Sequence, residues 1–383
     1  MAALIIPFYK PYYTGAEESY IRDAMARNRI SGDGFYTAKV KEFIEEMFSV
    51  YKVFLTTSAT HALEMAALLL NLEPGDEVLM PSFTFPSTAN AVVLRGARPV
   101  FVEIQASTLN IDPADLEEKI TPRSKAIIPV HYAGIGCEMD QIMSLAREHQ
   151  LQVIEDAAQA VNASYRGRYL GTWGQMGCYS FHETKNITCG EGGALLINVG
   201  DTEMIQRAEQ IIQKGTNRRQ FIDGEVDRYT WVNWGSSYTP SEVLTAFLYA
   251  QFMELERITA KRRMIHGAYT HYLLPYARSG KIGIPVIPSA CQSNYHLYYI
   301  LFPTETARKN AQKALASSGI ETAFHYVPLH SSPMGQRLGY RSGDLPLTED
   351  LSRRLLRLPF FTGMTDSEIE YVMEHVTGIL EKI

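Results

Sequence analysis

The stretch LQVIEDAAQ, residues 151–159, decides the fold class of this chain. A short, mainly apolar run leads directly into two adjacent carboxylates, Glu155 and Asp156. Short runs of this kind, rich in β-branched residues, are typical of buried strands in a parallel sheet. The acidic pair then falls at the carboxyl end of the strand, where open α/β sheets bind their ligands.

Similar short runs recur on both sides of this stretch, between about residues 50 and 200, and are bounded by Gly, Pro and Asp. Helical patterns, for example Ala62–Leu70 and Met139–His149, lie between them. This alternation predicts an α/β fold whose large domain has a mostly parallel central sheet flanked by helices. The other strand candidates are Val78–Met80, Pro99–Val102, Ala126–Val130, Met176–Phe181 and Ala194–Ile197.

A long helical stretch, Thr239–Lys261, is predicted to lead into a second domain. We therefore expect a large domain over residues 1–250 and a smaller α+β domain over residues 251–383. The smaller domain is expected to contain a strand at Tyr295–Leu301 and helices at Thr306–Ser317 and Asp366–Leu380.

The composition excludes several classes of protein. The 383 residues carry a net charge of −6 with mixed signs, which argues against a nucleic-acid binder. Four widely spaced cysteines without a C-x-x-C pair suggest neither disulfides nor a zinc site, so no metal is expected. The first residues, MAALIIPFYKP, lack the features of a signal peptide, and no run is long enough to cross a bilayer. We expect a cytoplasmic protein without a membrane partner.

Residues 55–65, LTTSATHALEM, form a candidate phosphate cradle. A strand-like piece passes through small hydroxyl residues into strong helix formers, and backbone N–H groups at a helix N-terminus favour a phosphate. The competing interpretation is a simple N-cap by Ser58 or Thr60.

Two further segments contain candidate reactive groups. Asp156 is expected to be partly buried, so it needs a cationic partner such as a protonated ring nitrogen of a cofactor. Alternatively, it caps the following helix. Lys185 lies in a polar turn that precedes a glycine-rich turn, Gly190–Gly193. A desolvated lysine forms Schiff bases, whereas a lone loop lysine is otherwise a solvated surface residue.

Taken in order, these segments resemble the DegT-type nucleotide-sugar aminotransferases, a branch of the fold-type-I enzymes that depend on pyridoxal 5'-phosphate (PLP). The likeness runs through nearly the whole chain. The residues that carry it are Pro74–Val78, Pro81–Phe85, Glu155–Gln159, Ser180–Asn186 and Gly190–Gly193.

The resemblance implies a role for each matching residue. Lys185 is expected to bind PLP as a Schiff base and to move the proton during transamination, and Asp156 to pair with the pyridinium nitrogen. Gln159 is expected to reach the ring hydroxyl and Phe85 to stack on the ring. The remaining residues are expected to bind the phosphate (Ser58, Ala59 through its N–H, and Ser180) or to form the nucleotide-sugar cleft (His325, Tyr326 and His330).

Three segments most resemble the WecE-type branch, the dTDP-4-amino-4,6-dideoxygalactose transaminases. That branch implies glutamate as amino donor and dTDP-4-keto-6-deoxyglucose as acceptor. The gluco epimer and C3 amination remain open because the shape of the pocket decides between them. The segments are Val130–Gly134, Lys214–Arg218 and Phe324–His330.

The chain departs from the family at Gly235–Thr239. Many relatives have an Asn here that reaches the PLP phosphate of the partner subunit and an Arg two residues later. This chain has Ser237 and Thr239 instead, a variant that the WecE-type branch shares. The resemblance implies a homodimer with shared active sites, and we hypothesise that Tyr229–Tyr238 reaches into the neighbouring site.

Two other functions are compatible with the motifs. A PLP-family sugar 3-dehydratase has a His in place of the Schiff-base lysine; His182 lies nearby, but Lys185 occupies the lysine position. A catalytically silent homologue is the other alternative, although Asp156, Ser180 and Lys185 are all present.

Overall fold

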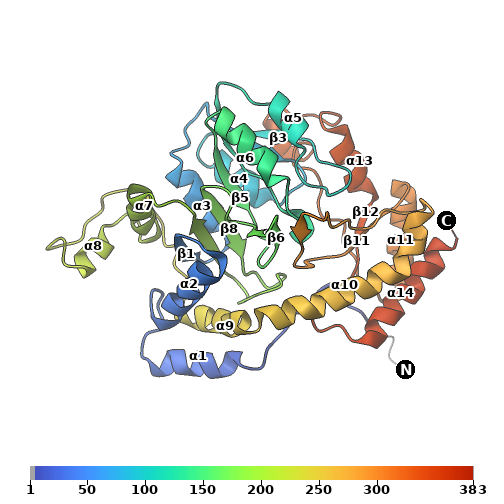
Figure 1. Cartoon of the computed structure of the whole chain (residues 1–383), viewed down its shortest axis with the longest axis horizontal. Coiled ribbons are helices and arrows are strands. Elements are labelled where there is room, and N and C mark those ends of the chain that lie inside the picture. The colour runs from blue at the N-terminus through green and yellow to red at the C-terminus, as the bar shows by residue number, and fades with distance from the viewer. Residues whose placement is uncertain (1–4, 383) are drawn as a thin grey trace.

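Seven strands form one central sheet in the computed structural model, which describes residues 5–382 (Figure 1). Their order is β1-β9-β8-β5-β4-β2-β3. Strand β9 runs antiparallel to both of its neighbours, and every other neighbouring pair is parallel. The prediction of a mostly parallel sheet is therefore confirmed. The strands are β1 (Lys52–Thr56), β2 (Glu77–Pro81), β3 (Arg98–Val102), β4 (Ser124–Ile127), β5 (Gln152–Asp156), β8 (Met176–Ser180) and β9 (Gly193–Ile197).

Each strand buries side chains on both faces of the sheet. In β9, Ala194 and Leu196 belong to one core cluster, and Leu195 and Ile197 belong to the other. Because successive side chains of a strand alternate, a sheet covered on both faces needs apolar residues at every position. The first cluster includes residues of α2 (Phe35–Phe48), α6 (Met139–Glu148) and α9 (Glu242–Met253); the second includes residues of α3 (Ala59–Leu69), α4 (Pro86–Val93) and α7 (Thr202–Ile212).

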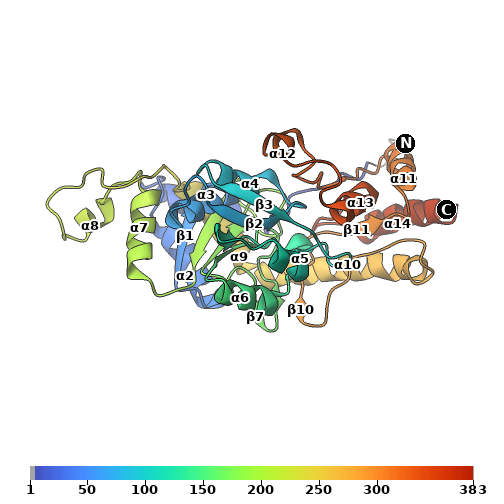
Figure 2. The ribbon, with the colours of Figure 1, turned by 90° about the horizontal axis from the view of Figure 1, so that it is seen from above.

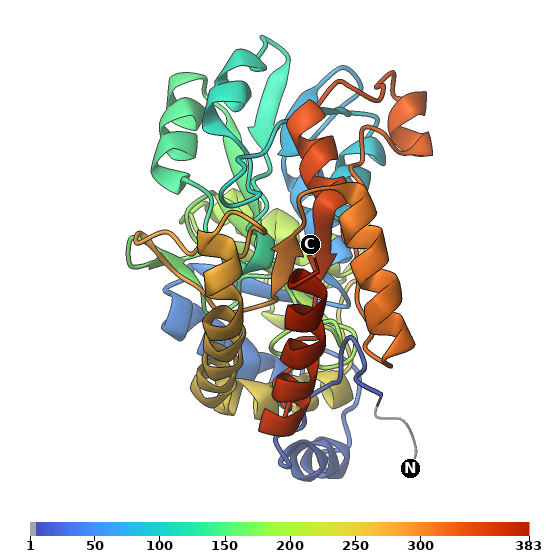
Figure 3. The ribbon, with the colours of Figure 1, turned by 90° about the vertical axis from the view of Figure 1, so that its right-hand side faces the viewer.

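A third hydrophobic cluster lies in the C-terminal part, where α10 (Leu255–Arg278), α11 (Glu305–Ser317) and α14 (Asp366–Leu380) pack together (Figure 3). Strand β11 (Tyr299–Leu301) pairs antiparallel with β12 (Leu355–Arg357) beside them. Ile6 also belongs to this cluster and bridges to Ile320. The remaining elements are α1 (Glu17–Ala26), α5 (Pro113–Glu118), α8 (Arg218–Ile222), α12 (Pro333–Arg337), α13 (Pro346–Arg354), the short 3₁₀ helix Tyr132–Gly134, and β6 (Ser164–Tyr165), β7 (Arg168–Tyr169) and β10 (Cys291–Gln292).

Two expected elements differ in the structure. The stretch Thr239–Lys261 is not one helix, because the backbone leaves helical geometry at Glu254 (φ −111°, ψ 13°) between α9 and α10. The strand expected at Tyr295–Leu301 is shorter and begins at Tyr299. The division of the chain at residue 250 stays a prediction; that position lies within α9.

The segment around α8 projects from the body of the molecule (Figure 2). It follows α7, and the chain that returns from α8 carries aromatic side chains that are largely exposed: Tyr229 (53%), Trp231 (74%) and Trp234 (70%). Exposed aromatic side chains gathered on one projection are typical of an interaction surface. Within residues 5–382, no helix has the length and apolar character that crossing a membrane requires.

Candidate active site

A cleft of about 650 Å³ opens at the carboxyl ends of β1, β2, β5 and β8. Strand β9 pairs with both β1 and β8 and so brings two walls of the cleft together. Within β9, Gly193 lies opposite Thr56 of β1 and opposite Ser180 of β8. A Cβ at Gly193 would lie 2.4 Å from the backbone N of Ala59, so only glycine permits this approach. Ser58 and Ser180 consequently lie on one wall of the cleft.

The structure shows that Ser58 is an N-cap, and this does not prevent the segment from lining the cleft. Ser58 caps α3, since its Oγ accepts a hydrogen bond from the His61 N–H at 3.2 Å. Ser58, Ala59 and Thr60 also line the cleft, at the end of the helix where backbone N–H groups lack partners within the helix. This end of the cleft therefore favours an anionic group.

Asp156 ends β5 and is buried, with 6% of its surface exposed. Its Oδ2 accepts a hydrogen bond from the Thr88 hydroxyl at 2.7 Å, and its Oδ1 accepts one from the Ala158 N–H at 3.2 Å. Thr88 is in turn 2.8 Å from the hydroxyl of Thr84. A turn follows β5 instead of a helix, so Asp156 is not a helix cap. Its carboxylate is held at the edge of the cleft, ready to pair with a cation.

Lys185 lies in the turn after β8, is half-buried and lines the cleft, so it is not a solvated surface lysine. Burial lowers the pKa of its amine from the ordinary 10.5 to about 8; Asp156 opposes this shift and Arg357 adds to it. Desolvation disfavours the charged ammonium, which leaves a larger neutral fraction near pH 7. A neutral amine is the form that attacks a carbonyl carbon.

Gln159 and Tyr326 form the wall next to Asp156. The Gln159 side chain accepts a hydrogen bond from the Ala133 N–H at 2.8 Å and donates one to the Tyr326 hydroxyl at 3.0 Å. Its amide nitrogen has a second N–H that this contact does not use. Phe85 presents its ring to the cleft with 57% of its surface exposed, as a stacking platform requires. His325 stacks on Tyr326 with ring centroids 5.7 Å apart.

Two of the expected site residues do not line this cleft. His330 is fully buried behind it, where its imidazole contacts the Ser82 hydroxyl at 2.7 Å and the Glu349 carboxylate at 3.0 Å. It therefore supports the loop that bears Tyr326, a correction to the expected substrate contact. Ser237 is exposed outside the cleft and is bridged to Gln213, the residue that follows α7.

Several cleft residues were missed by sequence reasoning. Arg357 and His296 line the cleft but lie far along the chain from any motif. Thr88 does not line the cleft, but it lies in the first turn of α4 and contacts Asp156 from there. His296 is buried beside Lys185, with its Nδ1 2.9 Å from Asn186 Oδ1. Burial, with the charges of Lys185 and Arg262, holds the pKa of His296 well below its ordinary value, so the imidazole is neutral. No local pattern reveals such residues, because only the tertiary fold brings them to the cleft.

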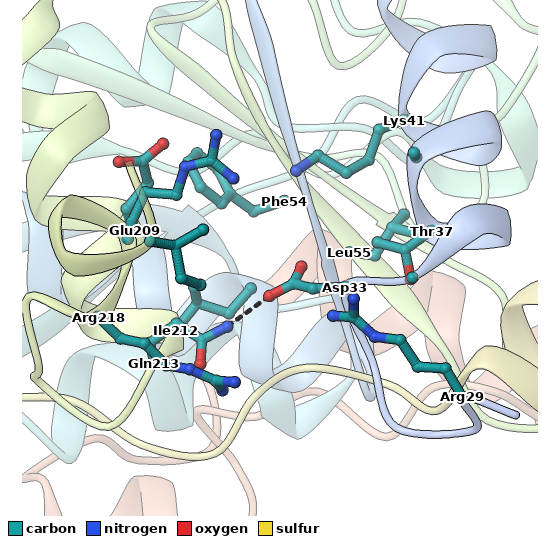
Figure 4. A pocket seen from close by; sticks show the side chains of 14 residues that line it. Arg29, Asp33, Thr37, Lys41, Phe54, Leu55, Glu209, Ile212, Gln213 and Arg218 are labelled. Carbon is teal, nitrogen blue, oxygen red and sulfur yellow. Dashed lines mark hydrogen bonds between the residues drawn. The ribbon is translucent and has the colours of Figure 1, made fainter. Parts of the chain in front are cut away.

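A second cavity of about 270 Å³ lies between α2 and α7 (Figure 4). None of the expected site residues lines it. Lys41 lies on one side and Glu209 and Arg218 lie on the other, and Gln213 donates a hydrogen bond to Asp33 across it. Phe54 also lines this cavity. Its charged groups have mixed signs.

The residues of the main cleft fit a planar, phosphorylated pyridine cofactor. Hydroxyls and N–H groups at the start of α3 suit a phosphate, and Asp156 suits a protonated ring nitrogen. Phe85 offers a ring face, and Lys185 offers an amine of lowered pKa. The arrangement can bind an aldehyde covalently and move a proton at the adjacent carbon.

This combination of fold and site defines an aminotransferase of fold type I that depends on PLP. More specifically, the chain belongs to the DegT/DnrJ/EryC1/StrS aminotransferase family, whose model matches residues 12–377. The enzyme is therefore a PLP-dependent sugar aminotransferase.

Several similar proteins agree with this membership. The chain is 31% identical over 372 residues to GDP-perosamine synthase of Escherichia coli O157:H7, covering 97% of both chains. The aminotransferase TlmJ of Streptoalloteichus hindustanus superposes with a TM-score of 0.90 at 29% identity, covering 99% of this chain and 100% of the other. Spr1654 of Streptococcus pneumoniae in its PLP form gives a TM-score of 0.92 at 25% identity, covering 99% of each.

Proposed function

We propose that this enzyme transfers an amino group from glutamate to C4 of a nucleotide-linked 4-keto-6-deoxyhexose. The acceptor is dTDP-4-keto-6-deoxyglucose and the product dTDP-4-amino-4,6-dideoxygalactose, as the likeness to the WecE-type branch suggests. The observation that carries the proposal is the presence of Lys185, Asp156 and the Ser58 wall in one cleft of about 650 Å³. That volume suits a cofactor together with a sugar. The expected cytoplasmic location remains a prediction.

In this proposal, different residues of the cleft bind different parts of the cofactor. Ser58, Ala59 and Ser180 hold the cofactor phosphate, Phe85 supports the ring, and Gln159 donates to the ring hydroxyl. Bound PLP supplies an electron sink for the carbon that loses a proton.

In the proposed reaction, Asp156 balances the positive charge of the ring nitrogen. Lys185 would first hold the cofactor covalently and would then carry the proton between the nitrogen-bearing carbon of the substrate and the cofactor. Tyr326 and His325 form the side of the cleft where the sugar enters.

We further propose a homodimer in which the partner's projecting segment completes the site. The aromatic side chains around α8 support this, since they are largely exposed in the single chain. Ser237 then donates to the cofactor phosphate of the neighbouring subunit. A fully active monomer in sedimentation and kinetic assays would contradict this arrangement.

Product analysis tests the proposed reaction. Purified enzyme is supplied with PLP, glutamate and dTDP-4-keto-6-deoxyglucose, and the amino sugar is identified by NMR. An axial amine at C4 supports the galacto product. An equatorial amine gives the gluco epimer, and an amine at C3 of an isomeric ketose overturns the C4 assignment. GDP-4-keto-6-deoxymannose in a parallel reaction tests the nucleotide, because one relative is a GDP-perosamine synthase.

A further inference from the structure

His296 faces the active-site cleft from the loop that precedes β11, and its position is fixed from behind. The residue is buried, with 6% of its surface exposed, and lines the cleft. Arg262 of α10 donates hydrogen bonds to the backbone oxygens of Tyr295 at 2.9 Å and of His296 at 2.5 Å. A guanidinium on a helix thus holds the backbone of His296, so the imidazole is presented to the cleft by a rigid support.

Asn186 determines which ring nitrogen of His296 carries the proton. The amide nitrogen of Asn186 donates a hydrogen bond to the backbone oxygen of Asn294 at 2.8 Å. Because a carbonyl oxygen only accepts, this contact fixes the orientation of the amide, and the Asn186 Oδ1 faces His296 Nδ1 at 2.9 Å. An amide oxygen also only accepts, so the proton is on Nδ1. In a neutral imidazole the other nitrogen, Nε2, is then an acceptor without a proton.

The surroundings of His296 keep its imidazole neutral. Its pKa is held well below the ordinary value by burial and then by the positive charges of Lys185, Arg262 and Arg357. Within residues 5–382, no carboxylate forms an ion pair with His296 that would offset these charges, and Nε2 makes no hydrogen bond. A buried acceptor without a donor is costly, so Nε2 needs an N–H or O–H group from within the cleft.

Lys185 can supply this group. It directly precedes Asn186, the residue that holds the imidazole, and it lines the same cleft. Among the three neighbouring cations, Lys185 lowers the pKa of His296 the most. Arg262 already donates to backbone oxygens, whereas the Lys185 amine has no bonded acceptor within residues 5–382. The amine and Nε2 therefore complement each other.

We propose that Nε2 of His296 accepts a hydrogen bond from Nζ of Lys185 whenever this amine is not bonded to the cofactor. The four-carbon side chain of a lysine has many rotamers, which must be restrained for the amine to reach the same carbon in every turnover. His296 is thus a positioning residue. It takes up no proton, and Lys185 remains the proton carrier. The inference rests on the proposed role of Lys185, but not on which sugar accepts the amine.

The tautomer is tested in the apoprotein, without any cofactor. The protein is labelled with ¹⁵N-histidine, and a long-range ¹H–¹⁵N correlation spectrum at pH 7 distinguishes the two neutral tautomers from the imidazolium. The spectrum of His296→Gln identifies the His296 signals by their loss. We expect a proton on Nδ1 and none on Nε2. In Lys185→Met, the Nε2 signal should move towards that of an acceptor without a partner, because the hydrogen bond is lost.

The contact with Lys185 is tested by the pH dependence of PLP capture by the apoprotein. His296→Leu removes the acceptor, whereas His296→Gln keeps an amide oxygen near the position of Nε2. His266→Leu is the matched control, since His266 is also buried and packs on Tyr295 of the same loop but does not line the cleft.

Without the acceptor, the ammonium form of Lys185 loses a hydrogen bond, so the pKa of Lys185 falls. We expect the break in the capture rate to move down by about one pH unit in His296→Leu and to stay within about 0.3 units of the wild type in the other two variants. In the half-reaction with glutamate, the rate at saturation should fall about tenfold in His296→Leu, while KM changes by less than about twofold.

Either of two results would overturn the inference. A proton on Nε2, or an imidazolium at pH 7, removes the acceptor. A pH break in His296→Leu that matches the wild type or His266→Leu removes the contact with Lys185. If His296→Leu fails to fold, as judged by circular dichroism, the spectrum of Lys185→Met decides, because an unchanged Nε2 signal contradicts the hydrogen bond. An enzyme that captures PLP but aminates no keto sugar contradicts the proposed function and leaves these readouts decisive.

Discussion

Two cavities of this enzyme each contain a lysine whose pKa is lowered by burial. Lys185 lies in the active-site cleft, and Lys41 lies in the second cavity, its Nζ 5.5 Å from the centroid of the Phe54 ring (Figure 4). Burial is the largest cause for both lysines, and a neighbouring cation adds to it, Arg357 for the first and Lys52 for the second. Desolvation alone therefore does not distinguish the two sites.

The difference lies in what surrounds each amine. Around Lys185, the buried carboxylate of Asp156, the hydroxyl wall at Ser58 and the ring of Phe85 face one open cleft. Around Lys41, Asp33 and Glu209 are simply acidic neighbours that raise its pKa, and the lining contains no comparable cradle of hydroxyls at a helix start. We infer that these neighbouring groups, and not desolvation alone, allow a lysine to bind a cofactor. Variants of the two lysines and of one acid in each cavity test this difference.

Replacement of the two lysines should give the largest contrast. We expect Lys185→Ala to lower turnover by at least about 10⁴-fold, because it removes both the nucleophile and the proton carrier. The absorbance band of the covalently bound cofactor should disappear as well. Lys41→Met should retain turnover within about twofold. If Lys185→Ala keeps both activity and the band, the role of Lys185 is refuted.

Neutralisation of one acid in each cavity gives the next largest effect. Asp156→Asn keeps the shape and an acceptor oxygen for Thr88 but removes the charge that balances the ring nitrogen. We expect kcat to fall by about 10²- to 10³-fold. Glu209→Gln in the second cavity should change kcat by less than about twofold. Equal losses in the two variants would mean that Asp156 acts only through the fold.

The pH dependence of cofactor capture sharpens the comparison further. Because the pKa of Lys185 is about 8, the neutral fraction of its amine falls about tenfold per pH unit below that value. The second-order rate of PLP capture by the apoprotein should rise with that slope up to about pH 8 and then level off. A rise that continues towards pH 10.5 would show that the lysine is not desolvated. Asp156→Asn should move the break to lower pH, since Asp156 raises the pKa of Lys185.

The parts of the site that were predicted from the sequence lie next to each other along short motifs. Asp156 became a candidate because an apolar run ends in it, and Lys185 because a polar turn between two strands contains it. The local patterns also allowed a helix cap and a surface lysine, and the resemblance to the aminotransferase family was needed to assign the two residues to one site. The structure brings both to one cleft because strand ends in a parallel sheet meet at one edge.

The residues that escaped prediction depend on tertiary packing. Arg357 comes from a short strand whose register is set by β11, and Thr88 matters only because α4 faces the end of β5. His330 was misjudged because its motif, Phe324–His330, faces the cleft through Tyr326 while the chain buries His330 against Glu349. The break between α9 and α10 at Glu254 could not be predicted from the sequence either, because apolar periodicity continues on both sides of it.

The smallest expected effect concerns the stability contribution of Lys41. Its pKa is lowered in the folded protein, so folding disfavours its ammonium form. That cost is fully present below the folded pKa and fades as the pH rises through the folded pKa towards 10.5. Lys41→Met removes the charge and keeps an apolar side chain against Phe54. We expect the free energy of unfolding in urea to rise by less than about 1 kcal/mol at pH 7 and the gain to shrink at pH 10.5. A loss of stability at pH 7 would instead mean that attraction to Asp33 and Glu209 outweighs burial, which would make the second cavity an ion-pair site unlike the cleft around Lys185.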